Sequence, residues 1–205
     1  MNLSSALGRL RAEVRALEQD PSVEWLPKSR DGKWGSLTLR SLYGESGQFL
    51  TKGAVEKGAA LHKYTPAGEA CPNIRFLLND LNTDVYLVRL LRLDPGELVK
   101  FHTDDVVFRD VRKVVRLHLP IFTSPSAVLR FGSPLQEPAP GYHVWRARQE
   151  MEAHIPAGEL WYTNVNALHS VYNGGVEPRV HLVADVRPSS KLARALEEWA
   201  SEREN

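Results

Sequence analysis

Two stretches of the chain alternate apolar with polar residues, and this period of two constrains the fold more than any other feature. The first stretch runs from Val114 to Ile121 and the second from Arg179 to Val186. Because successive side chains of a β-strand point to opposite faces of its sheet, each stretch is expected to form a strand with one apolar face. The opposite faces carry Arg116, His118, Arg179, His181 and Asp185. Such polar faces can point to water, or they can line a site inside a β-fold.

A His-x-Asp motif, formed by His102 and Asp104, follows a third strand-like run. That run extends from Tyr86 to Leu93 and ends at the turn Asp94-Pro95-Gly96, where proline and glycine suit their turn positions. The motif is short, and on its own it also fits a solvated loop. Strand-like runs lead towards a second histidine, His169, and away from it. A β-barrel can bring residues that are so distant in sequence to the same open end of the barrel.

These residue types suit a metal ion with open coordination positions. Two neutral imidazoles and one carboxylate on one face of a metal are typical of non-haem Fe(II) oxygenases, so we expect His102, Asp104 and His169 to bind Fe(II). Arg179 follows His169 by ten residues. Its planar guanidinium can bind a carboxylate through two parallel hydrogen bonds, as needed to anchor the far end of 2-oxoglutarate.

The segment between His169 and Arg179 contains Asn173-Gly174-Gly175, which is a strong turn signal. A reversal there returns the chain so that both side chains can face one cavity. The turn is compatible with a tight hairpin and with a Greek-key step between two sheets.

Three segments between Val88 and Asp185, about half of the chain, match a known family: RLLRLDPGELVKFHTDD, VVRLHLPIFTSP and IPAGELWYTNVNALHSVYNGGVEPRVHLVADV. They resemble the aspartyl/asparaginyl β-hydroxylases and their bacterial relatives, the free-proline hydroxylases. The resemblance implies a mainly β fold, a double-stranded β-helix, that uses Fe(II), 2-oxoglutarate and O2 to hydroxylate an unactivated carbon. It also favours the Greek-key step over the hairpin.

The resemblance further implies roles for individual residues. His102 and His169 match the metal histidines of the family, and Arg179 matches the arginine that holds the distal carboxylate of 2-oxoglutarate. Arg116 and His118 match an Arg-x-His pair that meets the metal-side carboxylate. The animal enzymes have glycine at the position of Asp104, so this chain is more similar to the bacterial branch.

Length and pattern predict a single domain over residues 1–205. Residues 1–85 are expected to supply an N-terminal helix with supporting strands and a helix, residues 86–187 the catalytic jelly-roll or cupin-like barrel, and residues 188–205 a C-terminal helix. The predicted helices are an amphipathic one capped by Ser4 or Ser5 and ending before Pro21, one over Pro72–Leu81, and one over Ser190–Glu202. Trp34–Leu39 is predicted to be a strand, and a terminal helix could form a homodimer contact.

Composition excludes several classes of function. The formal net charge is +1, which gives no electrostatic reason to expect a nucleic-acid or membrane partner. The single cysteine, Cys71, cannot form an internal disulfide. We find no signal peptide and no run of eighteen apolar residues, so the expected location is the cytoplasm.

Substrate contacts are harder to assign from sequence. Arg109 lies in a charged loop after the His-x-Asp motif, Trp145 could form a wall of the pocket, and Asn164 and Asn166 precede His169. Each could bind an amino-acid-like substrate, free or within a peptide, and each could equally be solvated or part of the core. Two other classes stay open: another cupin-type metalloenzyme, which would leave Arg179 without a role, and a non-catalytic small-molecule-binding barrel.

Overall fold

The computed structural model describes residues 3–27, 34–47, 51–104, 113–136, 146–190 and 194. Its main feature is a pair of antiparallel sheets. The larger one has seven strands in the order β1-β2-β4-β11-β6-β9, with β3 paired to β2. These strands are β1 (Leu26–Pro27), β2 (Trp34–Leu42), β3 (His62–Tyr64), β4 (Val85–Leu93), β6 (Val115–Phe122), β9 (Trp161–Thr163) and β11 (Arg179–Val186).

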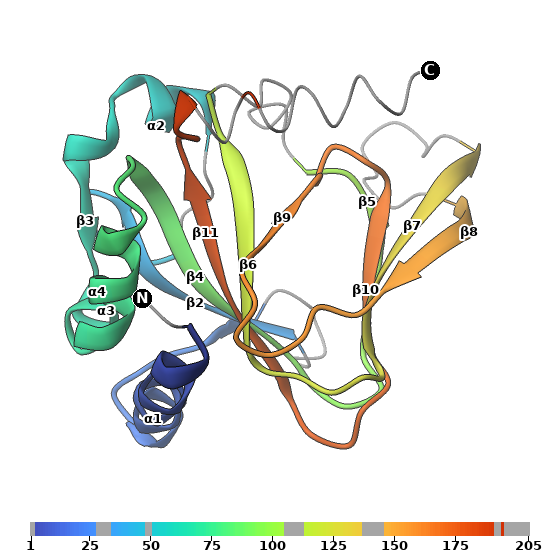
Figure 1. Cartoon of the computed structure of the whole chain (residues 1–205), viewed down its shortest axis with the longest axis horizontal. Coiled ribbons are helices and arrows are strands. Elements are labelled where there is room, and N and C mark those ends of the chain that lie inside the picture. Colours follow the sequence, from blue (N-terminus) through green and yellow to red (C-terminus); the bar gives the residue numbers. More distant parts are fainter. Residues whose placement is uncertain are drawn as a thin grey trace.

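The smaller sheet has four strands in the order β5-β10-β7-β8. They are β5 (Leu98–His102), β7 (Ala127–Gln136), β8 (Arg146–Ala153) and β10 (His169–Asn173). Figure 1 shows this sheet on the right, facing the larger sheet across the interior. Because consecutive strands β10 and β11 belong to different sheets, the turn at Asn173 is a Greek-key step and not a hairpin. The predicted mainly β, jelly-roll class of fold is confirmed.

The described helices cover the outer face of the larger sheet, on the left in Figure 1. They are α1 (Leu3–Gln19), α2 (Lys52–Glu56), α3 (Pro66–Glu69), α4 (Pro72–Asp80) and a short 3-10 turn, η1 (Ala59–Leu61). The apolar stripe of α1 buries Leu10, Val14 and Leu17 against this sheet. None of the helices in the described part of the chain is long and apolar enough to cross a membrane.

The two alternating strands, β6 and β11, separate an apolar layer from a polar one. Val180, Leu182 and Ala184 of β11 belong to the core beneath the helices, together with Leu117 and Leu119 of β6. The polar residues alternate with them and therefore face the smaller sheet. They are also buried: Arg116, His118, Arg179, His181 and Asp185 each expose 8% or less of their surface. The polar faces therefore line the interior and do not point to water.

Most predicted elements are present with shifted ends. The strand predicted from Trp34 continues to Leu42, and the predicted middle helix ends at Asp80. The capping role of Ser4 or Ser5 is wrong, because α1 begins at Leu3 and both serines lie within its first turn. Two short helices, α2 and α3, are additional to the supporting strands and the one further helix expected within residues 1–85. Their caps are threonines: the hydroxyl oxygens of Thr51 and Thr65 accept hydrogen bonds from the backbone N–H groups of Ala54 and Gly68. The predicted helix over Ser190–Glu202 lies largely outside the described residues.

Candidate metal centre

The two predicted metal histidines lie directly opposite each other on neighbouring strands. His102 ends β5, His169 begins β10, and the two are partners in the antiparallel register. Their ring centroids are 4.3 Å apart. Asp104 follows two residues after His102, and its backbone N–H donates to the carbonyl oxygen of Val165 at 3.0 Å. Strand pairing thus brings residues 67 positions apart to one end of the smaller sheet.

Backbone carbonyls fix the orientation of both imidazole rings. Nδ1 of His102 lies 2.8 Å from the carbonyl oxygen of Lys100, and Nδ1 of His169 lies 2.9 Å from that of Ala167. Each Nδ1 therefore carries the proton and donates it to the carbonyl. Each Nε2 is left with a lone pair, which is the form of histidine that binds a metal ion.

The ligand atoms converge on one point. One atom each from His102, Asp104 and His169 lie within 4.8 Å of one another, and Nε2 of His102 is 3.6 Å from Oδ1 of Asp104. Burial, together with the nearby His102, lowers the pKa of His169 to about 4, so this ring is neutral near pH 7. Two neutral imidazoles and a carboxylate on one side leave the other side of a metal open. The donor set therefore fits a divalent transition metal.

Arg116 forms ion pairs with two carboxylates of the described residues, Asp185 and Asp104. Its Nε and Nη2 donate to the two carboxylate oxygens of Asp185 at 2.7 and 2.9 Å, and its Nη1 donates to Oδ2 of Asp104. Burial favours the neutral form of the guanidinium, but Asp185 and Asp104 outweigh this effect and raise its pKa. We predicted from sequence that Arg116 contacts the cosubstrate. The structure places it against a candidate metal ligand.

Arg179 is also a buried cation, but its surroundings differ from those of Arg116. It exposes 5% of its surface, and its Nη2 donates to Nδ1 of His181 at 2.8 Å. Among the described residues it has no acidic partner, and burial lowers its pKa to about 9. An unpaired charge is costly inside a protein, so this position is suited to an anionic ligand that enters the interior.

His118 lies between the metal centre and Arg179. Neither ring nitrogen has a hydrogen-bond partner among the described residues, although both nitrogens are buried. Burial lowers its pKa well below the usual value, and Arg179, Arg116 and His169 lower it further through their charges. Its ring packs edge-on against His181, with centroids 5.9 Å apart. A buried imidazole with unmet hydrogen bonds is a second sign that a polar ligand binds here.

Of the four residues predicted to contact substrate, the structure describes two, Asn164 and Asn166. Asn164 accepts a hydrogen bond from the backbone N–H of Asn166 at 3.2 Å, and its carbonyl oxygen accepts one from Ala167. The two asparagines thus build the turn that presents the Ala167 carbonyl to His169. Arg109 and Trp145 lie outside the described residues.

Sequence reasoning missed two residues near the site. The alternation predicts the polar face on which Asp185 lies, but the pairing of Asp185 with Arg116 depends on the β6–β11 register, which the sequence does not reveal. Trp161 is the β9 partner of His118, so its side chain shares the interior face, where it is 40% exposed. The indole Nε1 of Trp161 donates to a carboxylate oxygen of Glu159 at 2.8 Å, which holds the ring at the edge of this face.

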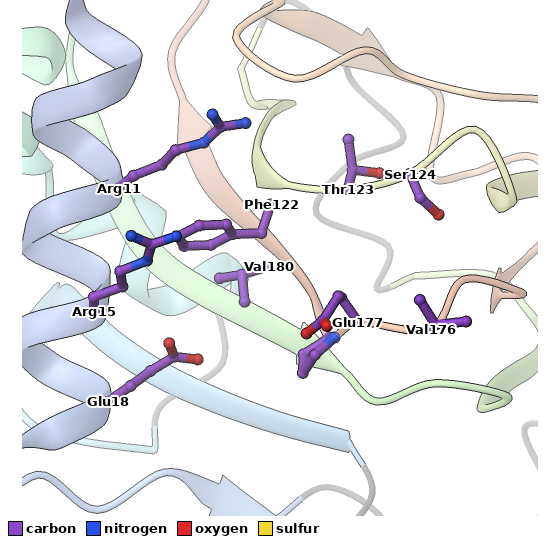
Figure 2. Close-up of a pocket in the computed structure, with 10 residues that line it drawn as sticks. Arg11, Arg15, Glu18, Phe122, Thr123, Ser124, Val176, Glu177 and Val180 are labelled. Carbon is purple, nitrogen blue, oxygen red and sulfur yellow. The ribbon is translucent and has the colours of Figure 1, made fainter.

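A separate cavity of about 520 Å³ lies on the helix side of the larger sheet. Figure 2 shows Arg11 and Arg15 of α1 extending towards Phe122 at its wall, with Glu18 and Glu177 also in the lining. The guanidinium carbons are 5.6 and 5.3 Å from the Phe122 ring centroid. Because the lining carries charges of both signs, it favours no single class of ligand.

Comparison with known proteins places the chain in a family. The sequence model described as Aspartyl/Asparaginyl beta-hydroxylase matches residues 5–188. The chain belongs to the aspartyl/asparaginyl β-hydroxylase family. The predicted resemblance is therefore confirmed, and it extends over the helices as well as the strands. No curated protein sequence matched the chain.

Solved structures of similar shape agree with this family assignment at the level of fold. The epimerase SnoN in complex with Fe3+, alpha ketoglutarate and nogalamycin RO has a TM-score of 0.56 and 13% identity, over 89% of this chain and 74% of SnoN. The non-haem alpha ketoglutarate dependent carbocyclase SnoK from nogalamycin biosynthesis has a TM-score of 0.52 and 12% identity, over 89% of this chain and 75% of SnoK. At such low identities the similarity shows a shared fold.

Proposed function

We propose that this member of the aspartyl/asparaginyl β-hydroxylase family is an Fe(II)- and 2-oxoglutarate-dependent dioxygenase. It hydroxylates a C–H bond of an amino-acid-like substrate, either a free amino acid or an Asp, Asn or Pro residue in a peptide. The observation that carries the proposal is Arg179, a buried guanidinium without an acidic partner among the described residues, in the same interior as the His102–Asp104–His169 cluster. A dicarboxylate that chelates a metal with one end needs such a cation for the other end.

The donor atoms fit the metal that the proposal requires. His102, Asp104 and His169 would hold Fe(II), because their carbonyl-bound Nδ1 atoms leave both Nε2 atoms available and Asp104 contributes an anionic oxygen. When bound, the iron and 2-oxoglutarate supply the oxidation chemistry: O2 is consumed, one oxygen atom enters the substrate, and succinate and carbon dioxide are the other products.

The protein's own residues bind and orient the reactants. Arg179 pairs with the distal carboxylate of 2-oxoglutarate, and His181 holds the guanidinium in place. His118 offers a hydrogen bond near the metal-side end, where its nitrogens have no partner in the described part of the chain. The buried strands β6 and β11 exclude water from one wall of this interior, which strengthens each charge interaction.

The family description and the residues around the metal centre support the proposed substrate class. Asn164 and Asn166 remain proposed contacts for an ammonium or carboxylate group, and Arg109 and Trp145 remain proposed on sequence grounds alone. Trp161 joins them, because it lies on the interior face beside His118 and is partly exposed. An apolar ring at this rim can hold the aliphatic part of a substrate while polar groups orient its ends.

Coupled turnover tests the proposal. The purified protein is incubated with ferrous iron, ascorbate, 2-oxoglutarate and a panel of free amino acids and short Asp-, Asn- and Pro-containing peptides, and succinate is measured. We expect slow release without substrate and faster release with one member of the panel. Absence of succinate under every condition rejects the dioxygenase. A cupin-type metalloenzyme of another class would ignore 2-oxoglutarate altogether.

A further inference from the structure

Asp185 is a buried carboxylate that neither metal nor cosubstrate binding accounts for directly. It exposes 1% of its surface and lies on β11, opposite Arg116 of β6 in the antiparallel register. Both of its oxygens accept hydrogen bonds from one edge of the Arg116 guanidinium, at 2.7 and 2.9 Å. Two parallel bonds of this kind fix the plane of the guanidinium as well as its position.

This fixed plane determines what the third nitrogen of Arg116 can do. Nη1 donates to Oδ2 of Asp104, so one of the two carboxylate oxygens of Asp104 is occupied. The other oxygen, Oδ1, is the one 3.6 Å from Nε2 of His102. The chain of contacts from Asp185 through Arg116 thus holds Oδ2 of Asp104 and leaves Oδ1 facing His102 within the three-residue cluster.

Charge balance adds a second reason for Asp185. Without Asp185, the buried Arg116 would lose the carboxylate on its Nε edge and would draw more strongly on Asp104, so it would compete with a metal for that carboxylate. With Asp185 bound on one edge, the guanidinium charge is already matched. Asp104 then keeps its negative charge available for a divalent ion.

We propose that Asp185 is a positioning residue for the metal centre, which acts through Arg116 to hold Asp104 as a one-oxygen ligand. This inference rests on the metal site of the proposed function. Outer contacts of this type change metal affinity by about 10–100-fold when they are removed. Asp185 itself is not a member of the ligand cluster, and both of its oxygens accept hydrogen bonds from Arg116.

The test measures Mn²⁺ affinity by calorimetry and the visible spectrum of the Co²⁺-loaded protein. Asp185→Asn should weaken Mn²⁺ binding by about 10–100-fold and change the Co²⁺ spectrum, because Asp104 is no longer held in one orientation. Asp94→Asn is the matched control, since Asp94 accepts a hydrogen bond from Arg92 at 2.9 Å but lies outside the metal centre. A folded Asp185→Asn protein with unchanged affinity and spectrum overturns the inference, even if its stability is reduced.

A double-variant cycle makes the result specific to Arg116. If Asp185 acts through Arg116, adding Asp185→Asn to Arg116→Gln should weaken Mn²⁺ binding no further. Additive losses overturn the inference. The double variant removes both buried charges, so it can be tested for metal binding even if Asp185→Asn alone does not fold. Wild-type Mn²⁺ affinity in the double variant would again overturn the inference.

His102→Ala separates this inference from the proposed function. If His102→Ala leaves Mn²⁺ affinity unchanged, the metal centre is wrongly assigned and the inference falls with it. If His102→Ala weakens binding and Asp185→Asn does not, the role of Asp185 alone is overturned.

Discussion

The carbonyl oxygens of Lys100 and Ala167 decide the chemistry of two histidines. Each accepts a hydrogen bond from the Nδ1–H of a histidine two residues later, so the protein backbone sets the tautomer. The sequence could reveal His102 through the His-x-Asp motif and His169 through its spacing to Arg179, but it could not reveal these carbonyl partners. They depend on the local path of the chain at the end of β5 and before β10. The rings are therefore oriented for a metal before one binds.

The metal ligands give the first prediction. His102→Ala, Asp104→Ala and His169→Ala should each weaken Mn²⁺ or Fe²⁺ binding by at least about tenfold, because each removes one of three protein ligands. Titration calorimetry measures the effect. His154→Ala is the control, because His154 also contacts a backbone carbonyl, that of Ala127 at 3.0 Å, but does not belong to the cluster. Unchanged affinity in the His169 variant would contradict the assignment.

Arg179 gives the second prediction. Arg179→Ala should weaken binding of 2-oxoglutarate or N-oxalylglycine to the metal-loaded protein by about a hundredfold or more, or roughly 3 kcal/mol, because the distal carboxylate loses a buried charged partner. Pyruvate has no distal carboxylate and should bind both proteins equally. Arg75→Ala, at an exposed pair with Glu69, is the control. Equal loss of pyruvate binding would show that Arg179 acts at the metal-side end.

At the scale of elements, the sequence could predict features that depend on neighbouring residues, but not contacts between residues far apart in the chain. Strands β6 and β11 could be predicted because apolar and polar residues alternate along each of them. The partner of α4 could not: Glu13 of α1 accepts hydrogen bonds from the backbone N–H groups of Asn73 and Ile74, sixty residues away. The same holds for Asn173, whose side chain joins β10 to the carbonyl oxygens of Leu93 and Glu177.

Gly68 gives a prediction about how one helix is seated. A Cβ atom at this position of α3 would lie 1.9 Å from the carbonyl oxygen of Leu39 in β2, so Gly68→Ala must push the helix off the strand. We expect a loss of about 1–3 kcal/mol in the free energy of unfolding. Gly8→Ala in α1 has open space and should stabilise the protein by about 0.5–1 kcal/mol. Urea unfolding compares the two variants, and equal stability would show that α3 does not need this close approach.

At the scale of the whole molecule, a layer of buried polar and charged side chains lies between the two sheets. The sequence could predict that Arg116 and His118 share one face of their strand and that Arg179 and His181 share one face of another. Whether those faces point inward depends on how the two sheets pack, which the structure decides. Burial lowers the pKa of both His118 and His181 well below the usual 6.5, so both rings stay neutral in the folded protein.

These histidines make stability depend on pH. In the unfolded chain they take up protons as the pH falls below about 6.5, whereas in the folded chain they do not, so stability is full above this value and decreases below it. The expected slope is about 1.4 kcal/mol per pH unit for each histidine. Urea unfolding at pH 7.5, 6.5 and 5.5 measures it. His181→Gln should reduce the slope, and an unchanged slope would contradict a neutral buried His181.

The Greek-key step at Asn173 carries the chain from the smaller sheet to the larger one. It places the metal ligands on one sheet and Arg179 on the other. A dicarboxylate held at one end by the metal and at the other by Arg179 would therefore act as a removable crosslink between the two halves of the sandwich. Binding of the cosubstrate would therefore stabilise the packing of one sheet on the other as well as fill the site.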